Sequence, residues 1–183
     1  GAFSALAIGE NDIPHVFDAQ TIAETDGLKV PPAKGRSDMR ALPFVTIDGA
    51  DARDFDDAVL ATPLEGGGWE IRVAIADVSH YVRPGSALDA EARKRGNSVY
   101  LPDRVVPMLP EALSNDLCSL RPNEPRAAMV AIITMDEDGD VISHSFERAL
   151  IRSAARLTYD EVQGWHEGNM TAGELELDEA ILT

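Results

Sequence analysis

The sequence predicts an α+β domain, in which a mixed or antiparallel sheet of hairpins carries helices at its periphery. Three observations indicate this fold class. Short β-prone runs are separated by turn-forming residues, two segments begin with helix-capping residues, and 44% of the 183 residues are hydrophobic. That content is sufficient for one domain with a packed core.

The first part of the chain, residues 1–42, contains few strand-like runs. Its stretch VPPAKGRSDMR includes paired prolines, which disfavour both helix and strand pairing. We therefore expect residues 1–42 to form a linker or wrapping segment. The β-prone runs begin after this stretch, so residues 43–183 are expected to form the main domain.

Two hairpins are predicted from the runs that follow. One hairpin is turned by EGGG and the other by DEDG, both typical turn sequences. The expected strands are FVTID at 44–48, DAVLATPL at 57–64, WEIRVAIADVS at 69–79, AAMVAIITM at 127–135 and DVISHSFERALI at 140–151.

Capping residues predict two helices. Ser86 is a suitable N-cap and Gly96 a suitable C-cap for a helix between them. Thr158 and Glu161 have the spacing of a capping box, which predicts a second helix that ends near Gly164.

The connection between the two predicted hairpins is rich in proline. Residues 101–122 contain four prolines, so we expect an irregular path with one short helical turn near Glu111 to Asp116. The tail after the last predicted helix is acidic and poorly patterned.

Charge and cysteine content limit the possible functions. The net charge of −16, from 16 basic and 32 acidic residues, argues against broad phosphate binding without a metal or additional basic parts. The lone Cys118 leaves no internal disulfide partner, and no Cys/His cluster suggests zinc, which favours a reducing, cytoplasmic location. The apolar start AFSALAIG is too short to span a membrane and lacks the basic residues of a signal peptide, so no membrane association is expected.

The stretch TIDGADARDFDDAV, residues 46–59, is the strongest candidate for a functional site. It contains five aspartates and one arginine: Asp48, Asp51, Asp54, Asp56, Asp57 and Arg53. Adjacent ionised carboxylates repel unless a cation binds between them, and Asp48 ends a run that should be half-buried. Oxygen-only donors favour Mg²⁺ or Mn²⁺, or Ca²⁺ as a structural ion, and the lack of a Gly-centred cage favours Mg²⁺ at a reaction centre.

Other interpretations of this acidic stretch stay open. A charge run is often a solvated loop. An EF-hand at residues 54–65 fits poorly, because Val59 stands where the sharp turn needs Gly, and residues 134–145 are better explained as a β-turn. The pair Asp54 and Asp56 also has the D-x-D spacing of phosphomonoesterases with an aspartyl nucleophile, although no downstream lysine or second acidic motif is recognisable.

The acidic stretch, with the block VAIADVSHYVRPGSALDAEARKRGNSVYLPDRVVPMLPEALSNDLCSL, closely resembles the catalytic domain of the RNase II (RNB) family of exoribonucleases, and within it the bacterial RNase R branch. The similarity runs from about Ile13 to about Tyr159. The resemblance implies Mg²⁺-dependent, processive hydrolysis of single-stranded RNA from its 3′ end, with release of nucleoside 5′-monophosphates. The RNase R branch also degrades structured RNA.

The resemblance assigns the family's four acidic positions to Asp48, Asp54, Asp56 and Asp57, and leaves Asp51 outside the motif. It implies that Asp48 and Asp57 are direct metal ligands. Asp54 would assist a second metal or the 3′-terminal sugar, and Asp56 would be the residue most critical to cleavage.

Tyr100 falls on the family position whose ring stacks on a base near the RNA 3′ end, although a tyrosine in a β-prone run can equally be a core residue. The basic run Arg93 to Arg95 could contact phosphates or complement the helix dipole. His80 and Tyr81 are interpreted as packing residues. The tryptophans, Trp69 and Trp165, are expected to be structural.

The family's catalytic domain continues beyond the position of Thr183 and there supplies an arginine and a glutamate to the active site. The resemblance therefore implies that this chain is the first part of a catalytic domain, preceded by a connector that follows a missing cold-shock region. Little or no activity is expected from this piece alone. A binding module that has lost catalysis is a further alternative, against which the retention of all four aspartates speaks.

Overall fold

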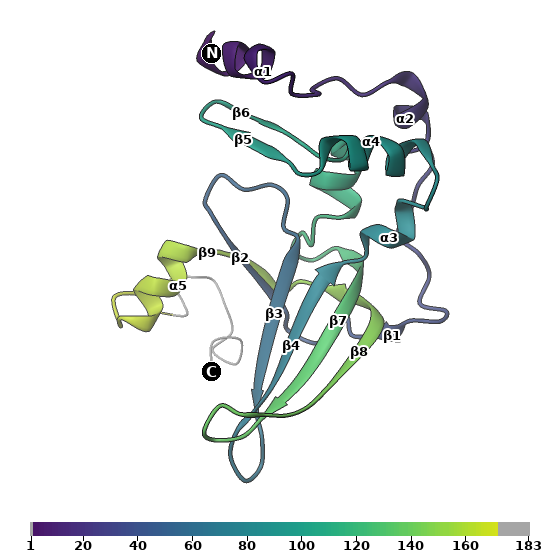
Figure 1. Ribbon diagram of the computed structural model, residues 1–183. Coiled ribbons are helices and arrows are strands. Elements are labelled where there is room, and N and C mark those ends of the chain that lie inside the picture. The colour runs from purple at the N-terminus through teal and green to yellow at the C-terminus, as the bar shows by residue number, and fades with distance from the viewer. Residues whose placement is uncertain (1, 172–183) are drawn as a thin grey trace. The chain divides into compact units, whose positions relative to one another are not determined.

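The structure, a computed structural model, describes residues 2–171 (Figure 1). The chain divides into two compact units. Within the described residues, the sheet unit comprises residues 30–77 and 118–171, and the helical unit comprises residues 2–29 and 78–117.

The sheet unit is built on one seven-stranded sheet with the order β1-β8-β7-β4-β3-β2-β9. Its strands are β1 (Ser37–Asp38), β2 (Val45–Asp48), β3 (Asp57–Pro63), β4 (Trp69–Ala76), β7 (Pro125–Met135), β8 (Val141–Arg152) and β9 (Ala155–Thr158). The long strands β3, β4, β7 and β8 lie side by side in Figure 1, and all neighbours among them are antiparallel. The predicted α+β class with antiparallel hairpins is confirmed.

Both predicted hairpins are present, and local turn chemistry explains each of them. Strands β3 and β4 pair from Asp57↔Ile75 to Pro63↔Trp69. In their turn, Gly68 has φ +82°, and a Cβ there would lie 2.2 Å from the carbonyl oxygen of Met135, so only glycine fits. The turn between β7 and β8 is closed in the same way, since residue 139 is a glycine with φ +87°.

Strand β9 and the two-residue strand β1 were not predicted. Strand β9 pairs with β2 in parallel, with Val45 opposite Ala155, and β1 pairs with β8 in parallel. Parallel pairing has no connecting tight turn that could reveal it in the sequence. The pairing is fixed by a small core of Val45, Ala155 and Leu157, against which Val162 packs.

Helix α5 (Tyr159–His166) follows β9 directly and contacts β9 and β2. The predicted capping box is confirmed, because the Thr158 hydroxyl accepts from the Glu161 amide and the Glu161 carboxylate accepts from the Thr158 amide at 2.7 Å. The helix continues to His166, two residues beyond the predicted end at Gly164. The acidic tail from residue 172 lies outside the described residues.

A buried ion pair stabilises the sheet unit at the end of β4. The Arg36 guanidinium donates to Asp77 at 2.7 Å, and the two side chains are 6% and 0% exposed. Arg36 also donates to the carbonyl oxygen of Ala149 in β8 at 3.4 Å. This pair therefore links the segment before β1 to the end of β4.

The helical unit contains four helices, one π-helical turn and one small hairpin within its described residues. These are α1 (Ala2–Glu10), α2 (Ala19–Ala23), α3 (Val78–Tyr81), α4 (Ala87–Arg95), β5 (Val99–Leu101), β6 (Arg104–Val106) and the π turn Leu113–Leu117. The predicted caps of α4 are confirmed, since Ser86 accepts from the Asp89 amide at 3.1 Å and Gly96 has φ +79°. Across the unit, the Glu24 carboxylate accepts from two amides of the first turn of α4.

The prediction that residues 101–122 form an irregular connection was partly wrong. Its beginning completes the β5–β6 hairpin, in which Tyr100 lies opposite Val105. The proline at position 102 is tolerated because it falls in the two-residue turn and not within a paired strand. The helical turn predicted near Glu111 is present and has π geometry. Over the described residues, no helix has the length and apolar character needed to cross a membrane.

Candidate functional site

The four aspartates singled out in the sequence belong to one end of the sheet unit. Asp48 is the last residue of β2 and Asp57 is the first residue of β3, and these two strands are antiparallel neighbours. The loop between them carries Asp54 and Asp56. The Asp56 carbonyl accepts from the amide at position 76 at 2.9 Å, so the loop joins the sheet before β3 begins.

The loop is anchored by Phe55, which lies between Asp54 and Asp56 and is 7% exposed. The Phe55 amide donates to the Ser119 hydroxyl at 3.1 Å, and that hydroxyl donates to the Arg53 carbonyl at 2.8 Å. The Phe55 carbonyl accepts from the amide at position 120 at 2.8 Å. The backbone that carries both aspartates is therefore held by a fully buried serine that the sequence analysis had not singled out.

Arg156 in β9 is a second residue that the sequence analysis missed. Its guanidinium donates to the carbonyl oxygens of Gly49 and Ala50 at 3.1 and 2.6 Å, directly after Asp48. The guanidinium carbon also lies 5.4 Å from the centre of the Phe55 ring. No sequence signal indicated these contacts, because they depend on the parallel register that places Arg156 opposite Thr46.

Two carboxyl groups of the cluster, those of Asp48 and Asp56, have a raised pKa. Burial, followed by the charges of Asp57 and Asp54, raises the pKa of Asp48, and the positive charge of Arg156 partly offsets this. Partial burial of its carboxyl, followed by the charges of Asp54, Asp57 and Asp48, raises the pKa of Asp56 to about 6. The site is therefore one of unbalanced negative charge.

One oxygen of this cluster is buried without a hydrogen bond. Oδ2 of Asp48 has no hydrogen-bond partner among the described residues, and such buried acceptors are rare because they lose their hydration. A bound cation would satisfy it. The donors are all carboxylate oxygens, which suit Mg²⁺ or Mn²⁺.

Within residues 2–171, no three His, Cys, Asp or Glu side chains are already arranged to hold a metal ion. The fit to a cation therefore rests on the donor chemistry, the mutual repulsion of the carboxylates and the unsatisfied oxygen of Asp48. Asp51 is exposed, which is compatible with its place outside the motif.

Cys118 lies beside this end of the sheet unit and is 2% exposed. Burial raises the pKa of its thiol to about 12, with further contributions from the charges of Asp56 and Asp77. The thiol is therefore kept in its protonated, unreactive form.

Tyr100 belongs to the helical unit, where it lies on β5 and is 64% exposed. It is therefore not a core residue. On α3 of the same unit, Tyr81 is 6% exposed and meets His80 edge to face with 4.9 Å between ring centres, which supports the predicted packing role. Trp69, which was expected to be structural, begins β4 and is 41% exposed.

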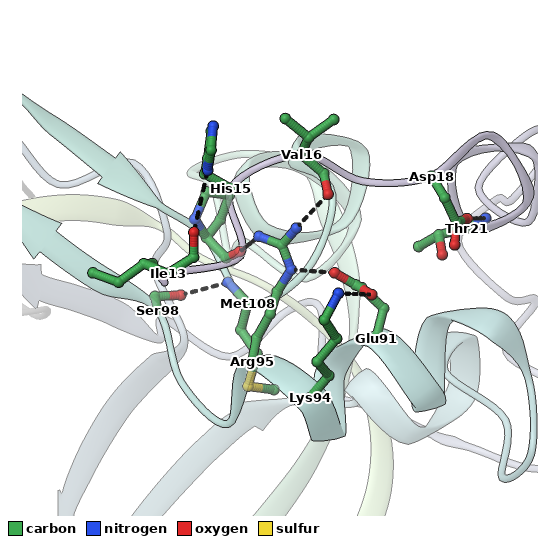
Figure 2. Close-up of polar contacts among 11 residues, drawn as sticks. Ile13, His15, Val16, Asp18, Thr21, Glu91, Lys94, Arg95, Ser98 and Met108 are labelled. Carbon is green, nitrogen blue, oxygen red and sulfur yellow. Dashed lines mark hydrogen bonds and ion pairs between the residues drawn. The ribbon is translucent and has the colours of Figure 1, made fainter. Parts of the chain in front are cut away.

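The basic run at the end of α4 divides into two kinds of residue. Figure 2 shows Arg95 turned into a network in which it donates to Glu91 and to the carbonyl oxygen of Val16, at 2.9 and 3.0 Å. Its side chain is 2% exposed, so it is structural. The side chains of Arg93 and Lys94 are 76% and 63% exposed, and these two keep the alternatives of phosphate contact and helix-dipole stabilisation open.

Comparison with known proteins agrees with this architecture. The RNB domain family matches residues 36–182. Ribonuclease R of Vibrio cholerae is 52% identical over 173 residues, covering 92% of this chain and 21% of the relative, and ribonuclease R of Escherichia coli is 52% identical over 165 residues, covering 88% and 20%. Mycoplasma genitalium RNase R in complex with ribose-methylated single-stranded RNA superposes with a TM-score of 0.89 at 34% identity, covering 96% of this chain and 27% of that one.

The chain spans about a fifth of the length of the curated relatives it matches. Its family match covers most of the sequence and includes the acidic stretch, the loop anchor Ser119 and strand β9. The resemblance found in the sequence is thereby confirmed, and the chain belongs to the RNB domain family.

Proposed function

We propose that the natural polypeptide that carries this chain is a Mg²⁺-dependent exoribonuclease, which hydrolyses single-stranded and structured RNA processively from the 3′ end and releases nucleoside 5′-monophosphates. The observation that carries this proposal is the cluster of mutually repelling aspartates at the ends of β2 and β3, with the buried and unsatisfied oxygen of Asp48, in a chain of the RNB domain family. The matched Mycoplasma genitalium RNase R was determined with RNA, which supports RNA as the partner.

In this proposal, Asp48 and Asp57 hold a divalent ion from two neighbouring strands. Asp54 assists a second ion or the 3′-terminal sugar, and Asp56 is the residue most critical to cleavage. When bound, such ions supply an activated water for in-line attack and stabilise the leaving 3′ oxygen. The chain's own contribution is positional, since Phe55 and Ser119 fix the backbone of the two loop aspartates.

Tyr100 is proposed to stack on a base near the RNA 3′ end. The residue is 64% exposed, and stacking accepts every base, as a sequence-independent exonuclease requires. The first 42 residues are proposed to be the connector that follows a cold-shock region, although they include α1 and α2. A cytoplasmic location is part of the same proposal, supported by the lone, buried thiol of Cys118.

The proposal is tested by cleavage of an RNA oligonucleotide labelled at its 5′ end, with Mg²⁺ present. The natural polypeptide should produce a ladder that shortens from the 3′ end, and the 183-residue chain alone should produce none. Asp56→Asn should abolish the ladder and leave RNA binding intact. Asp51→Asn is the matched control, because it removes an exposed carboxylate of the same loop and should leave cleavage unchanged.

Two other outcomes would replace the proposal. RNA binding without any cleavage by the natural polypeptide would indicate a binding module that has lost catalysis. Release of phosphate from a phosphomonoester, with a trapped phospho-aspartate at Asp54 or Asp56, would indicate a phosphohydrolase with an aspartyl nucleophile.

A further inference from the structure

The contacts of Arg156 point to a role in the acidic site. Arg156 is the only cation of β9, and it donates two hydrogen bonds to the Gly49–Ala50 turn, at 3.1 and 2.6 Å. That turn begins at the residue after Asp48. The Arg156 guanidinium carbon also lies 5.4 Å from the centre of the Phe55 ring.

Arg156 does not bind the nearby carboxylate of Asp48, and this is as informative as the bonds it makes. No ion pair joins Arg156 to Asp48 in the described part of the chain, although the positive charge of Arg156 acts on that carboxyl. Oδ2 of Asp48 and Nε of Arg156 are both buried and both lack a hydrogen bond. An arginine free to rotate would pair with such a carboxylate, since charge-assisted pairs are the strongest hydrogen bonds available.

The two hydrogen bonds to carbonyl oxygens explain why Arg156 forms no ion pair with Asp48. They hold the flat guanidinium against the turn, where its charge eases the repulsion among the carboxylates without occupying the oxygen of Asp48. Both bonds come from the same terminal nitrogen, Nη2, whose N–H directions are set by the guanidinium plane. A lysine could keep the charge, but its ammonium is a point charge on a flexible stem and fixes no such plane.

We propose that Arg156 is a positioning residue, which fixes the turn after Asp48 and keeps Oδ2 of Asp48 open to a divalent cation. This inference rests on the proposed function, because it assigns a role toward the same metal. Partners that orient metal ligands in this way change metal affinity by about 10- to 100-fold when they are removed.

The test compares Arg156→Lys and Arg156→Met with the unchanged natural polypeptide. Electron paramagnetic resonance measures the affinity for Mn²⁺. A second assay measures the cleavage of labelled RNA as a function of Mg²⁺ concentration. Both variants should bind Mn²⁺ about 10- to 100-fold more weakly and need correspondingly more Mg²⁺. Arg152→Met, which removes an exposed arginine of β8, is the control and should match the unchanged protein.

A role through charge alone predicts a different pattern. Removing a cation near a metal site should then tighten Mn²⁺ binding in Arg156→Met and leave Arg156→Lys unchanged, and that result would overturn the inference. Near-ultraviolet circular dichroism and melting temperature show whether each variant is folded, and Mn²⁺ affinities are measured well below its melting point, so a general loss of structure is distinguished from a loss of metal affinity. Normal affinity in the folded variants also overturns the inference.

The experiment distinguishes an error in the role of Arg156 from an error in the proposed function. If the unchanged protein binds Mn²⁺ and cleaves RNA but both Arg156 variants stay within twofold of it, only the positioning role is wrong. If the unchanged protein neither binds Mn²⁺ nor cleaves RNA, both the proposed function and the role of Arg156 are wrong.

Discussion

Ser119→Ala should loosen the acidic loop without removing any aspartate. The Ser119 hydroxyl is fully buried, accepts from the Phe55 amide at 3.1 Å and donates to the Arg53 carbonyl at 2.8 Å. The substitution removes one oxygen atom, so its cost comes from the partners it leaves behind and not from a cavity.

The two partners contribute unequally to that cost. Phe55 is buried, so its amide loses its only acceptor among the described contacts, which costs about 1 to 3 kcal/mol. Arg53 is exposed, and its carbonyl can turn to water. We therefore expect about 2 kcal/mol of local destabilisation, which corresponds to roughly a 30-fold larger population of the open loop.

Amide hydrogen exchange resolves this effect at single residues. In Ser119→Ala, the Phe55 amide should exchange about 30-fold faster, and the Mg²⁺ concentration needed for cleavage should rise. Ser153→Ala is the matched control, because Ser153 is equally buried in the same unit and donates to the Ala155 carbonyl at 2.8 Å, without any bond to the acidic loop. Phe55 exchange and Mg²⁺ dependence within twofold of the unchanged protein would refute the role assigned to Ser119.

Three further predictions follow from single contacts. Arg36→Met should lower the free energy of unfolding by about 3 to 5 kcal/mol in urea titrations, because it removes the cation bound to the buried carboxylate of Asp77. Arg40→Met, in an exposed pair, should cost much less, and equal costs for the two variants would contradict this. The Cys118 thiol, with its pKa raised from 9.0 to about 12, should resist a thiol reagent at pH 9 until urea exposes it. Its contribution to the free energy of unfolding should be present below pH 9 and lost as the pH rises toward 12. Rapid labelling of the folded chain would disprove the burial argument. Tyr100→Ala should weaken RNA binding by the natural polypeptide about 5- to 150-fold, because the ring provides about 1 to 3 kcal/mol of stacking. Tyr100→Phe should keep the affinity. An equal loss of affinity in both variants would indicate that the hydroxyl, and not the ring, binds RNA.

Local chemistry made much of this fold predictable. The two long hairpins follow from turn sequences between β-prone runs, and the capping box at Thr158 follows from a spacing of three residues. The acidic loop was equally visible, because its residues are consecutive. The β5–β6 hairpin was missed because Pro102 was interpreted as breaking a strand, whereas it occupies the turn.

Contacts between distant segments were not predictable from the sequence. Arg156 reaches carbonyls 106 and 107 residues earlier in the chain, and Ser119 binds an amide 64 residues earlier. Ser119 lies within the block that resembles the family, but a serine or an arginine gives no sign in the sequence of the partner it will find. The family resemblance predicted roles for four aspartates, whereas only the sheet order revealed which residues hold the loop that carries them.

The pairing of β2 with β9 also has a consequence for synthesis. The acidic loop is made before the strand that carries Arg156, which leaves the ribosome more than a hundred residues later. Because domains form only when all their elements are available, a growing chain should lack an ordered acidic cluster until β9 has emerged. The order of translation would thus delay the assembly of the proposed site until most of the sheet around it exists.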